Sequence, residues 1–219
     1  MSKGRLEAFS DGVIAILITI MVLGLVIPQG DSFSALSKLA PVFLSYVLSF
    51  INLGIYWNNH HHLLHAVRHV DGRVLWANLH LLFWLSLLPF VTHWTGETGF
   101  AAVPVAAYGG VLLLAGVAYW LLVRALIAKE GRDSLLASAI GSDFKGNISV
   151  LAYLAAIPLA FVERHVANAV YVAVAILWLV PDRRIERALA ERRGEPQRDA
   201  PHERPGDGAS VPVGGRPGP

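Results

Sequence analysis

The sequence predicts an all-α membrane protein whose chain crosses the bilayer six times. Hydrophobic residues make up 54% of the 219 residues, charged residues only 16%, and the mean hydropathy is +0.51. Apolar segments recur at membrane length, since about 20 apolar residues span a hydrocarbon core of about 30 Å. Helices satisfy their own backbone polar groups in lipid, and the alternating pattern of a membrane barrel is absent from the sequence.

We expect the spans at about 11–28, 39–63, 74–95, 101–127, 146–162 and 165–181. The last two are short and are separated only by Glu163-Arg164-His165, so they are expected to form a tight helical hairpin. Pro89 and Pro158 are expected to kink their helices. The N-terminal run is of membrane length and ends without a small-residue cleavage site, which argues against a signal peptide.

The distribution of Lys and Arg supports an even number of spans with both termini in the cytoplasm. With six spans, 16 of the 18 basic residues fall on the N-terminal side and only Lys38 and Arg164 fall on the other. Cytoplasmic enrichment of basic residues is the usual bias of membrane proteins. The pI near 9.0 is therefore attributed to topology in the cell membrane, and no nucleic-acid partner is expected.

Residues 1–182 are accordingly predicted to form one six-helix transmembrane domain, followed by a cytoplasmic tail over 183–219. The tail is rich in Pro, Gly and Arg and shows no apolar periodicity, which is typical of a largely disordered segment. Its mixed charge favours a solvated tail over one that binds a partner or anionic lipid.

Within the first span, one helical face carries Ile16, Thr19, Ile20 and Leu23 at the spacing i, i+3, i+4, i+7. Such a face is compatible with packing against neighbours or lipid as well as with lining a pathway. Thr19 is a weak signal by itself, because a threonine hydroxyl can bond back to its own helix.

Polar residues precede this face at the expected mouth of the span. Arg5 and Asp11 lie six residues apart, and a charge at the edge of the hydrocarbon is expensive unless it is paired. The two residues are therefore functional candidates. The alternative is a helix N-cap or an interfacial anchor, because Asp is favourable at the positive end of a helix.

These residues form the motif Arg5-x-x-x-Phe9-Ser10-Asp11, followed by Ile16 and Thr19. The second and third spans add further positions in a fixed order, namely Trp57-x-x-His60, Asp71, Asn78-Leu79 and Leu88-Pro89. Together the motifs resemble the signature of the transmembrane protein 175 family over about the first 95 residues. The remainder is similar only in its pattern of spans.

The resemblance implies a non-canonical cation channel, chiefly for potassium, built from four subunits whose first helices surround the pore. By this resemblance Ile16 forms a hydrophobic constriction, with Ile20 and Leu23 above it and Thr19 as a polar lining position. The family's signature also implies a polar network that holds the first helix, whose residues here are Arg5, Phe9, Ser10, Asp11, Trp57, His60 and Asn78. Proton permeability is left open.

The residues are compatible with such a channel. No Thr-Val-Gly-Tyr-Gly filter or re-entrant loop is present in the sequence, so an ordinary potassium filter is excluded. A ring of branched apolar side chains can instead gate by dewetting. Selectivity would then depend on pore diameter and on the cost of removing water, which is lower for potassium than for sodium.

A run of five histidines, His60, His61, His62, His65 and His69, suggests a different class of protein. The spacing of His61, His65 and His69 can place two imidazoles on one zinc or haem iron. The chain has no Cys, however, and no carboxylate lies in the run. A solvated helix end and a structural or pH-sensitive network around His60 are the alternatives. No metal and no cofactor are therefore expected.

The sequence argues against two further classes of protein. An ion-coupled secondary transporter usually keeps a titratable group at mid-membrane, whereas the acidic residues here lie near the ends of the predicted spans. An enzyme is not expected, because the sequence shows no nucleophile–base pair, phosphate-binding glycine loop or metal triad.

Overall fold

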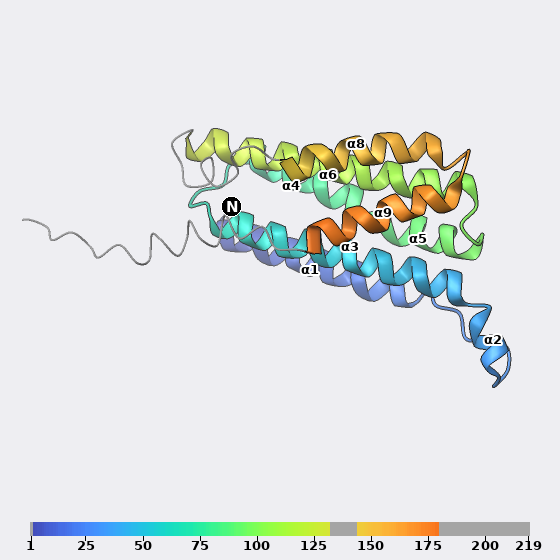
Figure 1. Ribbon diagram of the computed structural model, residues 1–219. Helices are drawn as coiled ribbons and strands as arrows, with labels where there is room; N and C mark the ends of the chain where they lie inside the picture. Colours follow the sequence, from blue (N-terminus) through green and yellow to red (C-terminus); the bar gives the residue numbers. More distant parts are fainter. Residues whose placement is uncertain (1, 132–143, 180–219) are drawn as a thin grey trace, which may run out of the picture.

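The computed structural model describes residues 2–131 and 144–179, and this part of the chain is helical with no β-strand (Figure 1). By length and composition, four segments can cross a membrane: α1 (Lys3–Val22), α3 (Ala40–His65), the pair α4 (Gly72–Ser86) and α5 (Leu88–Glu97), and α6 (Ala102–Glu130). Two shorter apolar helices follow, α8 (Phe144–Leu159) and α9 (Arg164–Leu179). The prediction of an all-α membrane protein is confirmed, and α8 and α9 occupy the positions of the last two predicted spans. The tail over 183–219 lies outside the described residues.

The helices run roughly along one axis and alternate in direction (Figure 1). Helix α6 packs against α4, α5, α8 and α9, and α3 packs against α1, α5 and α9. The short helix α2 (Phe33–Ser37) projects at the end of the bundle where α3 begins. The beginnings of α1, α4 and α8 therefore lie at the same end as the ends of α3, α6 and α9.

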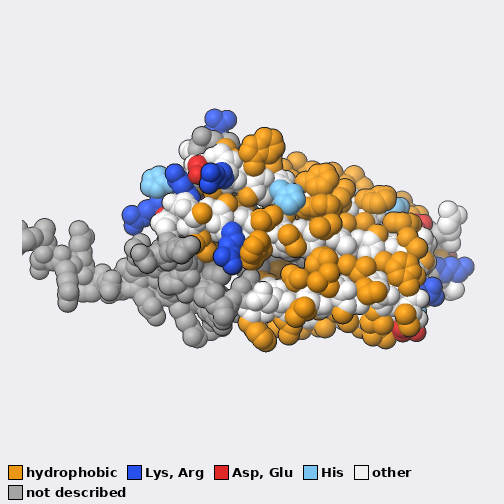
Figure 2. Space-filling model, turned by 90° about the horizontal axis from the view of Figure 1, so that it is seen from above, with side chains coloured by type: hydrophobic (Ala, Val, Ile, Leu, Met, Phe, Trp, Pro, Cys, Tyr) orange, Lys and Arg blue, Asp and Glu red, His pale blue; other side chains and the backbone are white. Residues whose placement is uncertain are grey.

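Apolar and charged side chains occupy different parts of the surface along the axis of the bundle. Figure 2 shows hydrophobic side chains along the body, with Lys and Arg gathered at the end where α1 begins and fewer of them at the opposite end. This is the surface that a bilayer requires, because the hydrocarbon region excludes unpaired charge while the interfaces accept it.

Capping and proline chemistry explain the boundaries of the third spanning segment. The Asp71 carboxylate accepts hydrogen bonds from the backbone N–H groups of Arg73 and Val74 at the start of α4. The bond from Val74, and then that from Arg73, hold the pKa of Asp71 below its usual value. Helices α4 and α5 meet at Leu87, because Pro89 has no N–H to donate and its ring crowds the preceding turn. The kink predicted at Pro89 is present.

Close helix packing in the core depends on glycine at two positions. A Cβ on Gly109 of α6 would overlap the Tyr171 hydroxyl of α9, and one on Gly96 of α5 would lie 2.7 Å from the Val42 Cα of α3. Neither approach leaves room for a side chain. Small residues that let helices approach are the usual way in which membrane helices gain packing energy.

Candidate functional site

Helix α1 has one packed face and one open face. Leu6, Ser10, Ile14, Leu17 and Met21 are buried against the neighbouring helices. On the opposite side, Ile16 is 56% exposed, Ile20 47% and Leu23 81%. The described part of the chain therefore leaves an apolar stripe along α1 uncovered.

Thr19 lies on this open face and donates its hydroxyl hydrogen to the carbonyl oxygens of Ala15 and Ile16, at 3.1 and 2.9 Å. The single hydrogen is thus used within the helix. The lone pairs of the oxygen remain on the open face, where they can accept a hydrogen bond from water or contact a cation.

The buried side of α1 is joined to α3 and α4 by three polar residues. The Ser10 hydroxyl donates to the Leu6 carbonyl at 2.9 Å and accepts from Asn78 Nδ2 at 2.9 Å. Asn78 Oδ1 lies 2.7 Å from His60 Nε2. Ser10, Asn78 and His60 are all fully buried.

The directions of these bonds make His60 a hydrogen-bond donor through Nε2. The only hydrogen of the Ser10 hydroxyl goes to Leu6, so the Asn78 amide must present its NH₂ to Ser10 and its oxygen to His60. That oxygen can only accept, so His60 donates from Nε2. His60 Nδ1 is buried and has no hydrogen-bond partner among the described residues, which suits the neutral ring, whose Nδ1 carries a lone pair and no hydrogen. An uncharged network therefore holds α1 in place.

A second contact between α1 and α3 lies closer to the surface. The Trp57 indole donates from Nε1 to Asp11 Oδ1 at 3.0 Å. The N-cap interpretation of Asp11 is wrong, because α1 begins at Lys3 and Ser2 is its N-cap residue. The helix begins before the apolar run, because a membrane helix can continue beyond the hydrocarbon into the polar interface.

Two members of the signature lie apart from this network. Arg5 is exposed and makes no side-chain hydrogen bond or ion pair with Asp11 or any other residue that the structure describes. Phe9 is also exposed, at 49%. Of the signature residues, Ser10, Asn78 and His60 form the buried network, and Asp11 and Trp57 form the second contact.

Two polar groupings were missed by sequence reasoning. Ser49 of α3 bonds to Thr92 Oγ1 at 2.6 Å and to the Tyr108 hydroxyl at 2.9 Å, which ties α3 to α5 and α6 in the core. Glu7 of α1 lies beside His61 and His65 of α3. The only sequence signal for the Ser49 grouping is a set of hydroxyl residues within apolar runs. No residue spacing predicts the grouping of Glu7 with His61 and His65. His69 lies beyond the end of α3, so the predicted series His61, His65, His69 does not continue on one helix.

The fold and the site thus define a helical, multi-pass membrane protein with a polar network that fixes its first helix. Residues 5–89 match the family described as the endosomal/lysosomal potassium channel TMEM175. A protein of Chryseobacterium sp. (strain P1-3), named a potassium channel, is 53% identical over 191 residues, which is 87% of this chain and 100% of that relative. This chain belongs to the TMEM175 family.

Two more distant comparisons agree. The crystal structure described as that of a lysosomal potassium-selective channel TMEM175 homolog from Chamaesiphon minutus matches with a TM-score of 0.72 and 29% identity, over 82% of this chain and 97% of that one. The human protein named endosomal/lysosomal proton channel TMEM175 is 34% identical over 116 residues, which is 48% of this chain but only 23% of the human one. The predicted family is therefore confirmed.

Proposed function

We propose that this chain is the subunit of a homotetrameric potassium channel of the cell membrane, with both termini in the cytoplasm. In this channel the open face of α1 lines the pore. The observation that carries the proposal is that α1 has two different faces. One face is held by buried polar contacts, and the other is apolar and exposed. The relative named a potassium channel, which the chain covers completely, supports the choice of ion.

Ile16 forms the constriction in this proposal, with one copy from each of four subunits. Branched apolar side chains offer a cation no ligand, so an ion must lose water to pass. Potassium loses water more readily than the smaller, more strongly hydrated sodium. Such a ring therefore discriminates by the height of a barrier and not by a binding well.

Thr19 adds a polar position next to that ring. Because its hydrogen is donated to its own helix, the oxygen can only accept toward the pore. An accepting oxygen favours cations over anions. The Ser10–Asn78–His60 network has a separate role, since it fixes the rotation of α1 and thereby the direction in which Ile16 and Thr19 face.

The direct test is ion flux into liposomes that contain the purified chain, compared for potassium, sodium and protons. Ile16→Ala widens the constriction, so potassium flux should rise and discrimination against sodium should fall, each by about threefold or more, which corresponds to about 0.7 kcal/mol of barrier. Ile176→Ala is the matched control, because Ile176 of α9 is the same residue type and is 58% exposed. Equal flux in both variants would place the pore elsewhere.

A second test uses the absence of cysteine from the chain. Single variants Leu23→Cys and Ile176→Cys carry one thiol each, on α1 and α9. A pore-lining Leu23 should be modified by a small water-soluble thiol reagent, and modification should reduce the flux. Modification of Ile176→Cys should leave the flux unchanged. Thiols at Leu23 that react only with lipid-soluble reagents would contradict the proposal.

Two other functions give different results in the same liposomes. Vertebrate relatives are named proton channels, and a proton-permeable pore would collapse a pH gradient without potassium. An ion-coupled carrier would saturate and would require its coupling ion, whereas a channel dissipates the potassium gradient alone. A histidine-ligated haem protein would be identified by its Soret absorbance.

A further inference from the structure

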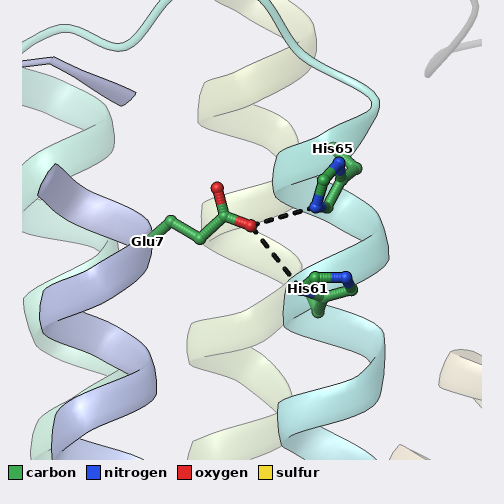
Figure 3. Close-up of side chains that lie close together, drawn as sticks. All are labelled: Glu7, His61 and His65. Atoms are coloured by element: carbon green, nitrogen blue, oxygen red, sulfur yellow. Dashed lines mark ion pairs between the residues drawn. The ribbon is translucent and has the colours of Figure 1, made fainter. Parts of the chain in front are cut away.

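We propose that Glu7, His61 and His65 form a binding site for a divalent transition-metal ion of the zinc type. The three side chains converge where α1 begins and α3 ends, with the carboxylate reaching from one helix to two imidazoles on the other (Figure 3). Glu7 Oε1 lies 3.5 Å from His61 Nδ1 and 3.1 Å from His65 Nε2. One ligand atom from each residue can be chosen so that all three lie within 4.8 Å of one another.

These separations fit the geometry of zinc. Ligands at about 2.1 Å from a tetrahedral zinc ion lie about 3.4 Å from one another. The separations of 3.5 and 3.1 Å from Glu7 Oε1 lie on either side of that value. His61 and His65 are four residues apart on α3, which places their rings on one helical face, with centroids 4.3 Å apart.

His61 faces Glu7 without forming a hydrogen bond to it. In the part of the chain that the structure describes, its Nδ1 is buried and has no hydrogen-bond partner, although it lies 3.5 Å from Glu7 Oε1. Without a metal ion, Glu7 can accept an N–H from each imidazole, which makes both rings donors toward one carboxylate. A divalent cation satisfies the same three groups with both rings neutral, because each ring then offers a lone pair.

The ligand types favour zinc over the common hard cations. Two imidazoles and one carboxylate suit zinc and its neighbours, whereas calcium and magnesium prefer oxygen ligands throughout. Three protein ligands leave a fourth position for water. Glu7 is 19% exposed at its side chain and His65 52%, so the site is open to water at the end of the bundle.

A bound ion would join α1 to α3 beside an existing contact. His61 also stacks against Trp57, with ring centroids 5.9 Å apart, and Trp57 bonds to Asp11 of α1. The ion and this hydrogen bond together would hold two successive turns of α1 to α3. An effect of the ion on ion flux rests on the proposed role of α1 as the pore wall, whereas binding itself does not.

The test is zinc titration of the full chain, purified in detergent with any histidine tag removed, followed by calorimetry and by metal analysis after dialysis. We expect one zinc ion per chain. Glu7→Gln and His65→Gln should each weaken binding by about 100-fold or more, since even loss of an outer-shell partner costs about 10- to 100-fold. His69→Gln is the matched control, because His69 belongs to the same run but lies outside the site.

A second readout guards against variants that fail to fold. Circular dichroism should show equal helix content in all four proteins, and zinc should raise the melting temperature only of the wild type and His69→Gln. A tenfold excess of magnesium should not displace zinc from the wild type or from His69→Gln. Equal zinc affinity in the wild type, Glu7→Gln and His65→Gln would overturn the site, whether or not the chain conducts ions. Zinc binding that is lost in these two variants would support the site even if the liposomes showed no potassium flux.

Discussion

Replacing Asn78 with leucine should destabilise the subunit, because Asn78 is the central member of the buried network between α1, α3 and α4. Leucine has a similar volume, so the change removes hydrogen bonds and leaves little space. Ser10 keeps its bond to the Leu6 carbonyl, but the His60 Nε2–H loses its acceptor at 2.7 Å. His60 Nδ1 already has no partner, so the buried ring would then have none at either nitrogen.

The magnitude follows from that orphaned donor. A buried donor left without a partner costs about 1–3 kcal/mol. Interhelical hydrogen bonds in bilayers contribute less, about 0.6 kcal/mol on average and up to about 1.7. We therefore expect a loss of about 1–3 kcal/mol in the free energy of unfolding, or roughly 5- to 150-fold in the ratio of folded to unfolded chain.

Unfolding by a denaturing detergent, followed by circular dichroism, measures this loss. Asn58→Leu is the matched control, because Asn58 is an exposed asparagine on α3 two residues from His60. The double variant His60→Leu/Asn78→Leu should recover much of the loss, since replacing both partners with apolar groups leaves no orphaned donor. The reasoning would be refuted by an Asn78→Leu chain as stable as Asn58→Leu. It would be refuted equally by a double variant whose loss exceeds that of Asn78→Leu alone.

Two further changes are tested by the same unfolding measurement. Tyr171→Phe should leave stability unchanged or raise it by about 1 kcal/mol. The Tyr171 hydroxyl is buried without a hydrogen-bond partner among the described residues, and its removal relieves that cost. A clear loss of stability would show that the hydroxyl is bonded in the membrane. Gly109→Ala should destabilise by about 1–3 kcal/mol, because the new methyl group overlaps the Tyr171 ring and α6 and α9 must separate, whereas Gly110→Ala, whose Cβ would meet nothing within 4 Å, should have little effect.

The helices of this protein could be predicted largely from local sequence. Apolar runs located α3 and α6 to within a few residues, and the lack of an N–H on Pro89 identified the break between α4 and α5. The start of α1 could not be found in this way. Hydropathy marks the residues that sit in hydrocarbon, whereas the helix begins at Lys3, in a polar stretch.

The side-chain pairs that form the site were beyond local sequence. The signature named Ser10, Asn78 and His60 together, but it also named Arg5 and Phe9, which the subunit leaves exposed. Glu7 could not be predicted as a partner of His61 and His65, because it comes from another helix and lies far from them in the sequence.

By itself, the sequence determined that the chain is a bundle of membrane-spanning helices with basic residues concentrated at one end, because hydropathy and charge act residue by residue against the bilayer. The tertiary structure alone decided which polar atoms meet. Ser10 and Asn78 are 68 positions apart, and their contact depends on the rotation and register of α1 against α4. Those are set by the packing of whole helices against one another, and no spacing within a single helix encodes them.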